Sequence, residues 1–195
     1  MSETDWFETA SGQMCDPHAE EPAYTAGDLI LGMARTCRFG GQLRNDVEFY
    51  SVVEHCWLLT TYAFKHVPNL GYRELRTLAM HDAAEGIIGD IIRPLKRVLP
   101  DYRYIEEKIE ADVARRFDLI YPWPDFVKEL DTRILKDERE QVMCTAAGNK
   151  WAVDDLEPLG VKCRGWPPFI AVNHYHQLLI VLGVKDFHKE RGLCV

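Results

Sequence analysis

Residues 51–66 read Ser-Val-Val-Glu-His-Cys-Trp-Leu-Leu-Thr-Thr-Tyr-Ala-Phe-Lys-His. Ser51 followed by Glu54 has the spacing of a capping box, which marks the N-terminus of an α-helix. Apolar residues continue from this start, so we expect one helix that ends near His66. No segment of the chain shows a convincing alternation of apolar and polar residues, and the predicted fold class is therefore all-α.

Five further helices are expected on the same grounds. They are predicted over residues 25–36, 72–86, 101–117, 125–147 and 167–183. Glycine and proline residues separate most of these stretches, because both residue types favour turns and interrupt helices. We interpret residues 87–100, which contain both residue types, as a bend or a short turn between helices rather than a strand.

Three of these helices have a predicted apolar face, because apolar residues recur in them at helical spacing; on the helix over 72–86 it consists of Leu75, Leu78 and Ala79. The face on the helix over 101–117 consists of Tyr104, Ile105, Ile109 and Val113. The face on the helix over 167–183 consists of Phe169, Ile170, His174, Leu178 and Val181.

The chain of 195 residues has a length that fits one domain. Its composition, 47% hydrophobic and 11% aromatic, suffices to build one core. We therefore expect a single compact bundle of about six helices over residues 25–195. Residues 1–24 mix acidic residues with prolines and glycine, and they are expected to form an extended or partly ordered arm that docks through Trp6 and Phe7.

Charge and hydropathy exclude several classes of function. Lys and Arg total 23 and Asp and Glu total 31, so the net charge is −8, which disfavours binding to a nucleic acid duplex. No apolar stretch approaches the roughly 20 residues of a membrane span, and the acidic N-terminus does not resemble a signal peptide. The six cysteines are far apart, without a CxxC pair, so we expect reduced thiols in a cytoplasmic protein.

The most informative dipeptide is His81-Asp82, although such a pair alone is weak support for a metal site. His55 lies inside an earlier predicted helix and Asp131 inside a later one. Two imidazoles and two carboxylates from three helices can converge on one divalent cation and leave coordination positions for water and substrate. The alternatives are a core role for His55 and Asp137 in place of Asp131 as the last ligand.

The donor set restricts the metal. Two histidines and two aspartates suit Zn²⁺, Co²⁺, Mn²⁺ or Fe²⁺ better than Mg²⁺, which prefers oxygen and water, and Mg²⁺ stays open as an alternative. We expect one divalent transition metal as the cofactor.

These residues resemble the HD-domain phosphohydrolases, whose pattern is H…HD…D. The resemblance covers about residues 25–145. Within the family, this chain is most similar in its motifs to the small bacterial and phage members of the 5′-deoxynucleotidase type. The matching stretches are Arg35-Thr-Cys-Arg-Phe-Gly-Gly41, Phe49-Tyr-Ser-Val-Val-Glu-His55, His81-Asp-Ala-Ala-Glu85, Gly89-Asp-Ile-Ile-Arg-Pro-Leu-Lys96 and Val127-Lys-Glu-Leu-Asp131. The same group includes phage enzymes that hydrolyse dATP to deoxyadenosine and triphosphate.

The resemblance implies a role for each matching residue. The metal ligands would be His55, His81, Asp82 and Asp131. Glu85 would position the attacking water or assist proton transfer, and Asp90 would contact the sugar 3′-hydroxyl. Members of the family with two metals carry extra histidines between the second and last ligands, and this chain has none there, which favours a single metal.

A protein with negative net charge needs a local cluster of cations to bind a nucleotide. Arg38, Lys96 and Lys128 are the candidates for contact with the phosphates, and Arg38 could bind a phosphate bidentately. Phe39 could stack on the base, at a position where relatives often carry tryptophan. Two lysines in addition to one arginine exceed the need of one phosphate, which favours a triphosphate substrate.

The expected function is therefore hydrolysis of a deoxynucleotide, foremost dATP or another dNTP, to deoxynucleoside and triphosphate. A 5′-deoxynucleotidase acting on dNMPs, a hydrolase of alarmones and a non-catalytic nucleotide-binding HD protein are the alternatives. The resemblance also implies a homo-oligomer in the cytoplasm of a bacterial or phage-infected cell.

Overall fold

The computed structural model describes residues 5–144 and 148–184. Its helices are α1 (Ala26–Arg35), α2 (Val52–His66), α3 (Tyr72–Met80), α4 (Glu85–Ile88), α5 (Arg93–Lys96), α6 (Pro100–Arg116), α7 (Asp125–Val142) and α8 (Pro168–Val181), with a short 3-10 helix, η1, over Arg38–Gly41. Across the described residues, the remaining regular structure is one antiparallel pair, β1 (Phe7–Glu8) and β2 (Met14–Cys15). The prediction of an all-α protein is confirmed.

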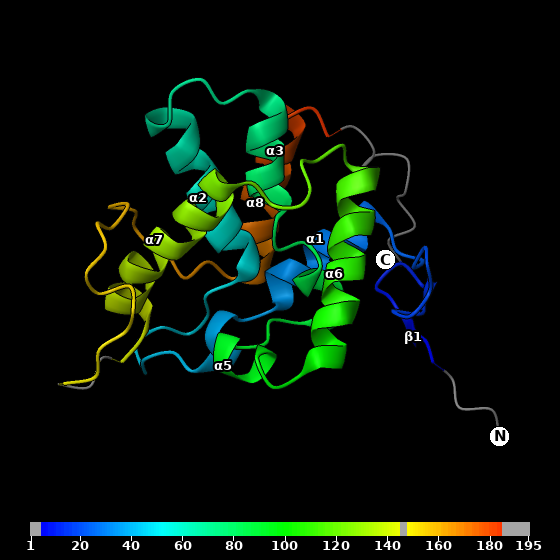
Figure 1. Ribbon diagram of the computed structural model, residues 1–195, viewed down its shortest axis with the longest axis horizontal. Helices are drawn as coiled ribbons and strands as arrows, with labels where there is room; N and C mark the ends of the chain where they lie inside the picture. The colour runs from blue at the N-terminus through cyan, green and yellow to red at the C-terminus, as the bar shows by residue number, and fades with distance from the viewer. Residues whose placement is uncertain (1–4, 145–147, 185–195) are drawn as a thin grey trace.

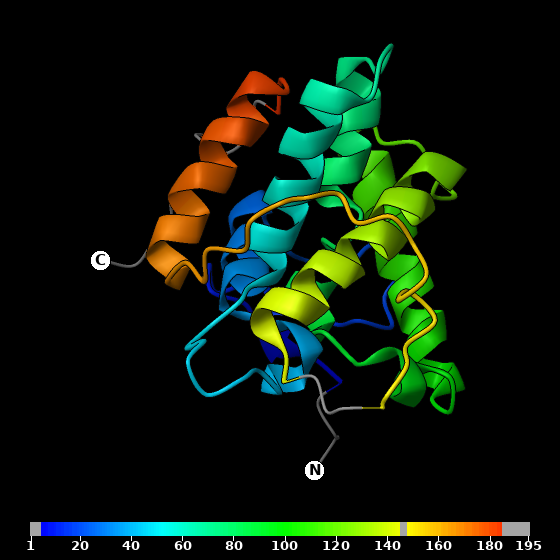
Figure 2. The same cartoon turned by 90° about the vertical axis from the view of Figure 1, so that its left-hand side faces the viewer.

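Helix α2 lies in the middle of the bundle and packs against α1, α3, α7 and α8. Figure 2 shows α8 on one side of α2 and α7 on the other. In Figure 1, α6 stands on the side of the bundle away from α7. The buried side of α2 includes Val53, Cys56 and Leu59, and each of these side chains is fully buried. This central position places His55 on α2 next to α7, which carries Asp131.

Helices α1 and α4 approach each other at two glycines. A Cβ atom added to Gly32 would lie 1.8 Å from the carbonyl oxygen of Gly86, and one added to Gly86 would lie 2.3 Å from the carbonyl oxygen of Leu29. Such distances leave room only for hydrogen, so the two backbones touch directly. The contact fixes the start of α4, where Glu85 stands.

The predicted single helix over 72–86 is wrong in its second half. Helix α3 ends at Met80, and residues 81–84 form turns in which Ala83, Glu85 and Gly86 donate backbone hydrogen bonds to the carbonyl three residues earlier. Directly after these turns, Gly86 packs against the backbone of α1 at Leu29 and Gly32. His81 and Asp82 therefore lie in a tight turn rather than on a helix.

The other helix boundaries agree with the sequence to within a few residues, with two exceptions. The predicted bend over 87–100 contains the one-turn helix α5 and the end of α4. Helix α7 ends at Val142, before the predicted 147, because Met143 is extended and the Val142 carbonyl accepts the Arg44 N–H. Residues 145–147 of that prediction lie outside the described residues.

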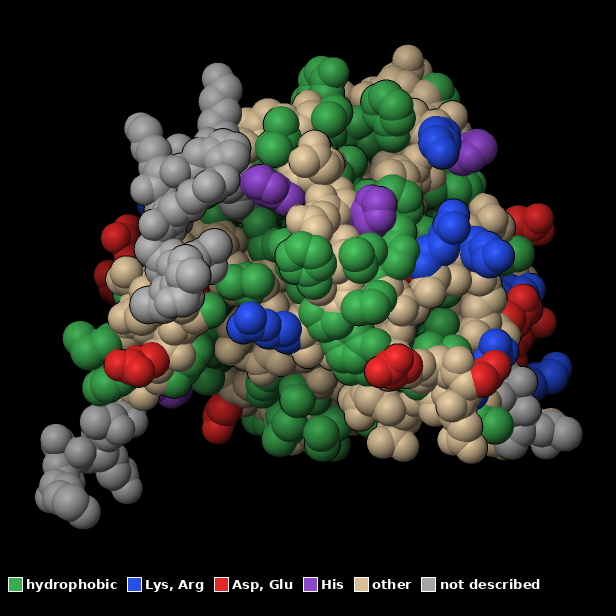
Figure 3. All heavy atoms as spheres, turned by 180° about the vertical axis from the view of Figure 1, so that it is seen from behind, with side chains coloured by type: hydrophobic (Ala, Val, Ile, Leu, Met, Phe, Trp, Pro, Cys, Tyr) green, Lys and Arg blue, Asp and Glu red, His purple; other side chains and the backbone are tan. Residues whose placement is uncertain are grey.

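The predicted apolar face of α8 is wrong for four of its five residues, whereas Leu178 is partly buried against the core. Phe169, Ile170 and Val181 are 75%, 39% and 64% exposed, and His174 is exposed as well. Ala171, Tyr175 and Leu179 are fully buried instead, as the face that packs on α1 and α2. The helix is apolar on nearly all sides, so periodicity could not select a face. The rear of the molecule, on the α8 side, accordingly shows hydrophobic side chains at its surface (Figure 3).

On α6 the predicted face holds except at its start. Ile109 and Val113 are fully buried, and Ile105 is partly buried against the core. Tyr104 is 63% exposed, and its ring lies 5.8 Å from the Lys108 ammonium. A tyrosine tolerates water at its hydroxyl end, so its place in an apolar pattern predicts burial poorly.

The capping box of α2 is half formed. The Ser51 side chain accepts the Glu54 N–H at 3.1 Å, as expected of an N-cap. The Glu54 carboxylate, however, accepts the backbone N–H groups of Arg164, Gly165 and Trp166 in the loop before α8. A loop far along the chain therefore competes successfully for the carboxylate that a capping box would use.

The N-terminal arm forms a hairpin, so the prediction of no strand is wrong there. Gly12, with φ +81°, allows the turn between β1 and β2. Trp6 and Phe7, the residues expected to dock, are 42% and 39% exposed. The arm is instead fixed by polar contacts, from Ser11 to Asp28 and from Tyr24 to Asp112, of which the second is buried.

Two general predictions can be compared with the described part of the chain. No helix described there combines the length and the apolar character that crossing a membrane requires. The described cysteines, Cys15, Cys37, Cys56, Cys144 and Cys163, are free, as expected, and Cys194 lies outside the described residues.

Candidate metal centre

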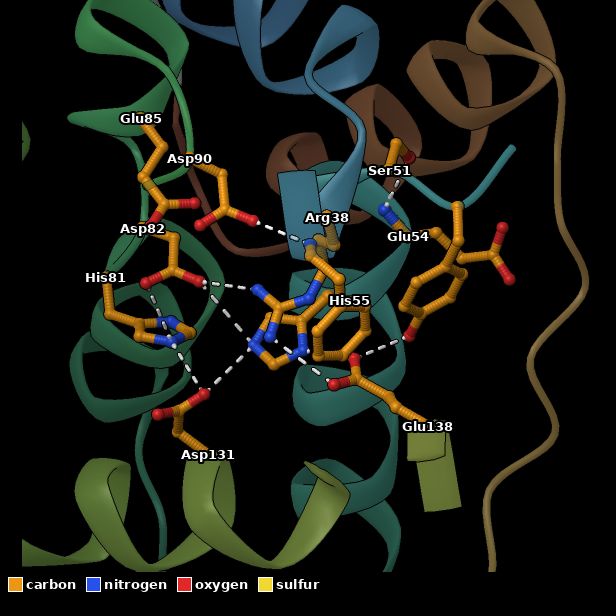
Figure 4. A network of polar contacts seen from close by, with 12 residues as sticks. Arg38, Ser51, Glu54, His55, His81, Asp82, Glu85, Asp90, Asp131 and Glu138 are labelled. Carbon is orange, nitrogen blue, oxygen red and sulfur yellow. Dashed lines mark hydrogen bonds and ion pairs between the residues drawn. The ribbon is translucent and has the colours of Figure 1, made fainter. Parts of the chain in front are cut away.

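Four predicted ligands converge between α2, the turn after α3, and α7. His55 comes from α2, His81 and Asp82 from the turn, and Asp131 from α7 (Figure 4). One ligand atom from each residue lies within 4.8 Å of the others. Asp137, the alternative to Asp131, instead accepts the backbone N–H groups of residues 159 and 160. The structure thus brings together the four residues that the HD pattern singles out.

Each imidazole is held from behind at its Nδ1 atom. His81 Nδ1 lies 2.8 Å from the Leu78 carbonyl oxygen, which can only accept, so Nδ1 carries the proton. His55 Nδ1 lies 2.6 Å from Glu138 Oε1. Both Nε2 atoms consequently point toward the aspartates. This is the arrangement typical of metal-binding histidines, whose second nitrogen is oriented by an outer hydrogen bond.

The two Nε2 atoms are buried and form no hydrogen bond of good geometry within the described residues. His55 Nε2 lies 3.3 Å from Asp131 Oδ1 and 3.5 Å from Asp82 Oδ2, and His81 Nε2 lies 3.3 Å from Asp82 Oδ1. Buried polar atoms without partners are costly, and a cation between these nitrogens and oxygens would satisfy all of them. The residues present therefore fit a divalent metal ion.

Electrostatics in the cluster point the same way. Burial lowers the pKa of His81, but the negative charge of Asp82 and the nearby carboxylate of Asp131 outweigh it and hold this pKa well above its usual value. Burial raises the pKa of Asp131, but the adjacent imidazoles of His55 and His81 dominate and keep that pKa well below its usual value. The aspartates thus attract positive charge strongly, as protons or as a metal ion.

Glu85 lies beside the cluster, above Asp82 in Figure 4. It is 6% exposed, its Oε1 accepts from the Lys96 ammonium at 3.1 Å, and its Oε2 is buried without a partner in the described residues. Burial, together with the charges of Asp82 and Asp90, raises its pKa well above the usual value. A carboxyl group with these properties can hold a proton for transfer at neutral pH.

Lys96 is placed by two carboxylates. Its ammonium donates to Glu85 at 3.1 Å and to Glu106 at 2.6 Å. These charges raise its pKa against the opposing effect of burial. The structure thus brings Lys96 to the catalytic candidate Glu85, although its charge is already matched within the protein.

Arg38, Phe39 and Asp90 form one unit next to the cluster, with Asp90 beside Glu85 (Figure 4). Arg38 is 7% exposed and donates to Asp82 Oδ2 and to Glu138 Oε2, both at 3.3 Å. Phe39 has φ +58°, and its backbone N–H donates to Asp90 Oδ2 at 3.0 Å. The predicted substrate-contacting residues at these positions therefore lie together, within reach of the ligand group.

Lys128 is placed differently from the other predicted cations. Its side chain is 63% exposed, and its ammonium lies 3.7 Å from Asp125 on the first turn of α7. It borders an open surface hollow of about 650 Å³ with Glu129, Thr132, Arg133, Leu156 and Glu157. The structure does not place this ammonium among the ligand residues.

Two residues of the site, Glu138 and Arg93, were missed by the sequence analysis. Glu138 is fully buried and bonds to His55, Arg38 and the Tyr50 hydroxyl. Arg93 donates to Asp131 Oδ2 at 2.6 Å. Glu138 follows Asp131 by two turns of α7, on the same face, and this spacing was an available signal. Arg93 gave no such signal, because it lies in a loop-like stretch.

Comparison with known proteins gives relatives but no activity. No protein-family model matches the chain. The protein YfdR of Escherichia coli is 36% identical over 116 residues, which are 59% of this chain and 59% of YfdR. A protein of Rhodobacter capsulatus is 32% identical over 120 residues, 59% of this chain and 61% of that protein. The alignments thus span about three-fifths of each relative, and both are named as uncharacterized proteins.

Proposed function

We propose that this protein is a metal-dependent phosphohydrolase that cleaves deoxynucleotides at the 5′-phosphate. The observation that carries the proposal is the pair of buried Nε2 atoms, from His55 and His81, that face Asp82 and Asp131 without a hydrogen-bond partner among the described residues. Glu85 and Arg38 flank this group with the proton donor and the cation that phosphate chemistry requires.

A divalent ion held by the four ligands, Zn²⁺, Co²⁺, Mn²⁺ or Fe²⁺ by their donor atoms, would polarise a phosphoryl oxygen and lower the pKa of bound water. Glu85 holds or transfers a proton at its partnerless Oε2. Arg38 presents its guanidinium to the phosphate from the Asp82 side. Asp90 has one oxygen on the Phe39 N–H, which leaves the other available for a sugar hydroxyl.

How many phosphate groups the substrate carries is inferred from the number of Lys and Arg side chains near the cluster. Lys128, one of the two lysines that favoured a triphosphate, does not contact the cluster, but Arg93 does through Asp131. The Arg93 side chain is 57% exposed and therefore accessible to a ligand. With Arg38, Lys96 and Arg93, three cations remain, and we keep the dNTP, foremost dATP, as the first candidate substrate. The position of Lys128 favours a dNMP as the second.

The test is a panel of dNMPs and dNTPs incubated with Mn²⁺ or Co²⁺, with products separated as nucleoside, phosphate and triphosphate. We expect deoxynucleoside plus triphosphate from a dNTP in the wild type and no product from Asp82→Ala. Deoxynucleoside from monophosphates alone would make the protein a 5′-deoxynucleotidase. Nucleotide binding without turnover for every substrate, guanosine polyphosphates included, would exclude hydrolysis and leave a nucleotide-binding protein.

A further inference from the structure

We infer that Glu138 is a positioning residue of the metal centre, which orients the metal ligand His55 and the cation Arg38 through its two carboxylate oxygens. This inference rests on the metal-binding part of the proposed function, and it does not depend on the substrate. It concerns a residue outside the HD pattern, because Glu138 lies two turns beyond Asp131 on α7.

The geometry around Glu138 is complete. Its Oε1 accepts from His55 Nδ1 at 2.6 Å and from the Tyr50 hydroxyl at 2.8 Å, while its Oε2 accepts from Arg38 Nη2 at 3.3 Å. The side chains of Glu138 and His55 are fully buried, and Tyr50 is fully buried as well. Figure 4 shows Glu138 behind His55, on the side away from Asp82 and Asp131.

The hydrogen bond to His55 determines which nitrogen faces the metal. A carboxylate oxygen accepts, so His55 donates from Nδ1 and presents the lone pair of Nε2 to Asp82 and Asp131. A negatively charged acceptor also makes the imidazole a stronger ligand than a neutral acceptor would. Removal of such an outer partner typically weakens metal binding by about 10-fold to 100-fold.

The other oxygen connects the same residue to the predicted phosphate site. Arg38 divides its guanidinium between Glu138 Oε2 and Asp82 Oδ2, and Asp82 is itself a predicted ligand. Glu138 and Asp82 therefore hold Arg38 at a fixed place beside the metal ligands. A change at Glu138 should alter the position of both groups at once, whereas a change in the loop contacts of Glu54 should alter neither.

Glu54 supplies a matched control, because its side chain is also a fully buried glutamate. Its carboxylate binds three backbone N–H groups of the loop before α8, and no hydrogen bond or ion pair recorded for the described residues joins it to the four ligands. E138Q keeps the shape but removes the charge, E138D keeps the charge but shortens the side chain, and E54Q repeats the first change at the control position.

The experiment measures the affinity of the full-length protein for Co²⁺ alone, by calorimetry and by the visible absorption of the bound ion. We expect E138Q and E138D to bind Co²⁺ about 10-fold to 100-fold more weakly than the wild type and to change the absorption spectrum. E54Q is expected to keep the affinity and the spectrum of the wild type, even where it lowers thermal stability. Wild-type affinity in E138Q would overturn the inference.

A measurement on the wild type covers the case in which the Glu138 variants do not fold. Imidazole ¹H–¹⁵N spectra of the Zn²⁺-loaded protein should show His55 protonated at Nδ1 and not at Nε2, and the opposite tautomer would contradict the inference. Absence of metal binding by the wild type would instead refute the proposed function itself, so the two failures can be distinguished.

Discussion

Glu54 and Glu138 are both fully buried glutamates, yet their surroundings differ in one respect. Glu54 accepts hydrogen bonds from three backbone amides, which are neutral, whereas Glu138 faces the guanidinium of Arg38 and the imidazole of His55. Burial raises the pKa of Glu54, and its amide partners do not reverse the direction. Burial also opposes ionisation of Glu138, but the charges of Arg38 and His55 prevail and lower its pKa.

Burial alone therefore does not identify a functional acid. A carboxylate that neutral donors surround fixes a loop, and its loss should appear in stability. A carboxylate among charged partners belongs to an electrostatic cluster, and its loss should appear in binding and catalysis. The predictions below separate these two kinds of effect.

The largest effect on activity is expected in the charged cluster, where Asp82 faces both histidines and Arg38. Asp82→Ala removes a predicted ligand and should lower phosphohydrolysis by about three orders of magnitude or more, the scale found when a central catalytic group is lost. Circular dichroism should show an intact fold. Residual activity within tenfold of the wild type would place the metal elsewhere.

Among the neutral partners of Glu54, Glu54→Ala leaves the backbone N–H groups of residues 164–166 without their acceptor. We expect a loss of about 3 kcal/mol in the free energy of unfolding, since each unsatisfied donor costs roughly 1 kcal/mol or more. Thermal melting should fall by about 10 °C, and Co²⁺ affinity should stay unchanged. The exposed Glu48→Ala is the control, with an expected shift close to zero.

Glu110 tests whether a partly buried acid without a cationic partner, and with the charge of Glu106 nearby, keeps a high pKa. Burial raises the pKa of Glu110 to about 7, although a hydrogen bond from Trp123 opposes the rise. Between the ordinary value of 4.5 and this value, the folded state keeps a proton that the unfolded state has lost. Stability should therefore fall as the pH rises through this interval and change no further above it.

Glu110→Gln removes this titration and should gain stability relative to the wild type as the pH rises, by up to about 3 kcal/mol at pH 8. Urea unfolding of the metal-free protein at pH 5 and pH 8 measures the difference. An equal effect of the variant at both pH values would show that Glu110 titrates normally.

The sequence predicted the ligand set and most helices for an identifiable reason. A capping residue, proline and helical periodicity are local signals, so the helices that begin at 26, 52, 100 and 125 were found within a residue or two. The turn after Met80 was missed because no glycine or proline marks it locally, and it leads into a contact of Gly86 with Gly32, which is distant in sequence. The buried face of α8 was missed because apolar residues occupy almost every side of that helix.

The residues of the site, like the helices, were predictable only where a local sequence signal marked them. His55, His81, Asp82 and Asp131 carry a spacing that resembles a known motif, and the structure brings them together. Glu138 was missed because an isolated glutamate on a helix resembles a solvent-exposed residue, and only the packing of α7 on α2 shows that it is buried. The reverse error occurred at Lys128, where sequence position suggested a contact that the side chain does not make.

The smallest effect on kcat/KM is expected at Lys128. Lys96 lies between Glu85 and Glu106, whereas Lys128 is exposed and 3.7 Å from Asp125, so these lysines repeat the contrast between a cluster and the surface. Lys96→Ala should reduce kcat/KM by about 10-fold to 100-fold, as expected for a hydrogen bond between charged groups. Lys128→Ala should change it less than about threefold, because exposed ion pairs contribute little.

Measurement of both variants with a dNMP and a dNTP sharpens this contrast. If Lys128→Ala raised KM for the dNTP tenfold and left the dNMP unaffected, the side chain would have to turn from Asp125 toward the terminal phosphates. Lys128 would then belong to the site in the dNTP complex. The difference between Lys96 in the cluster and Lys128 at the surface would hold only for the ligand-free protein.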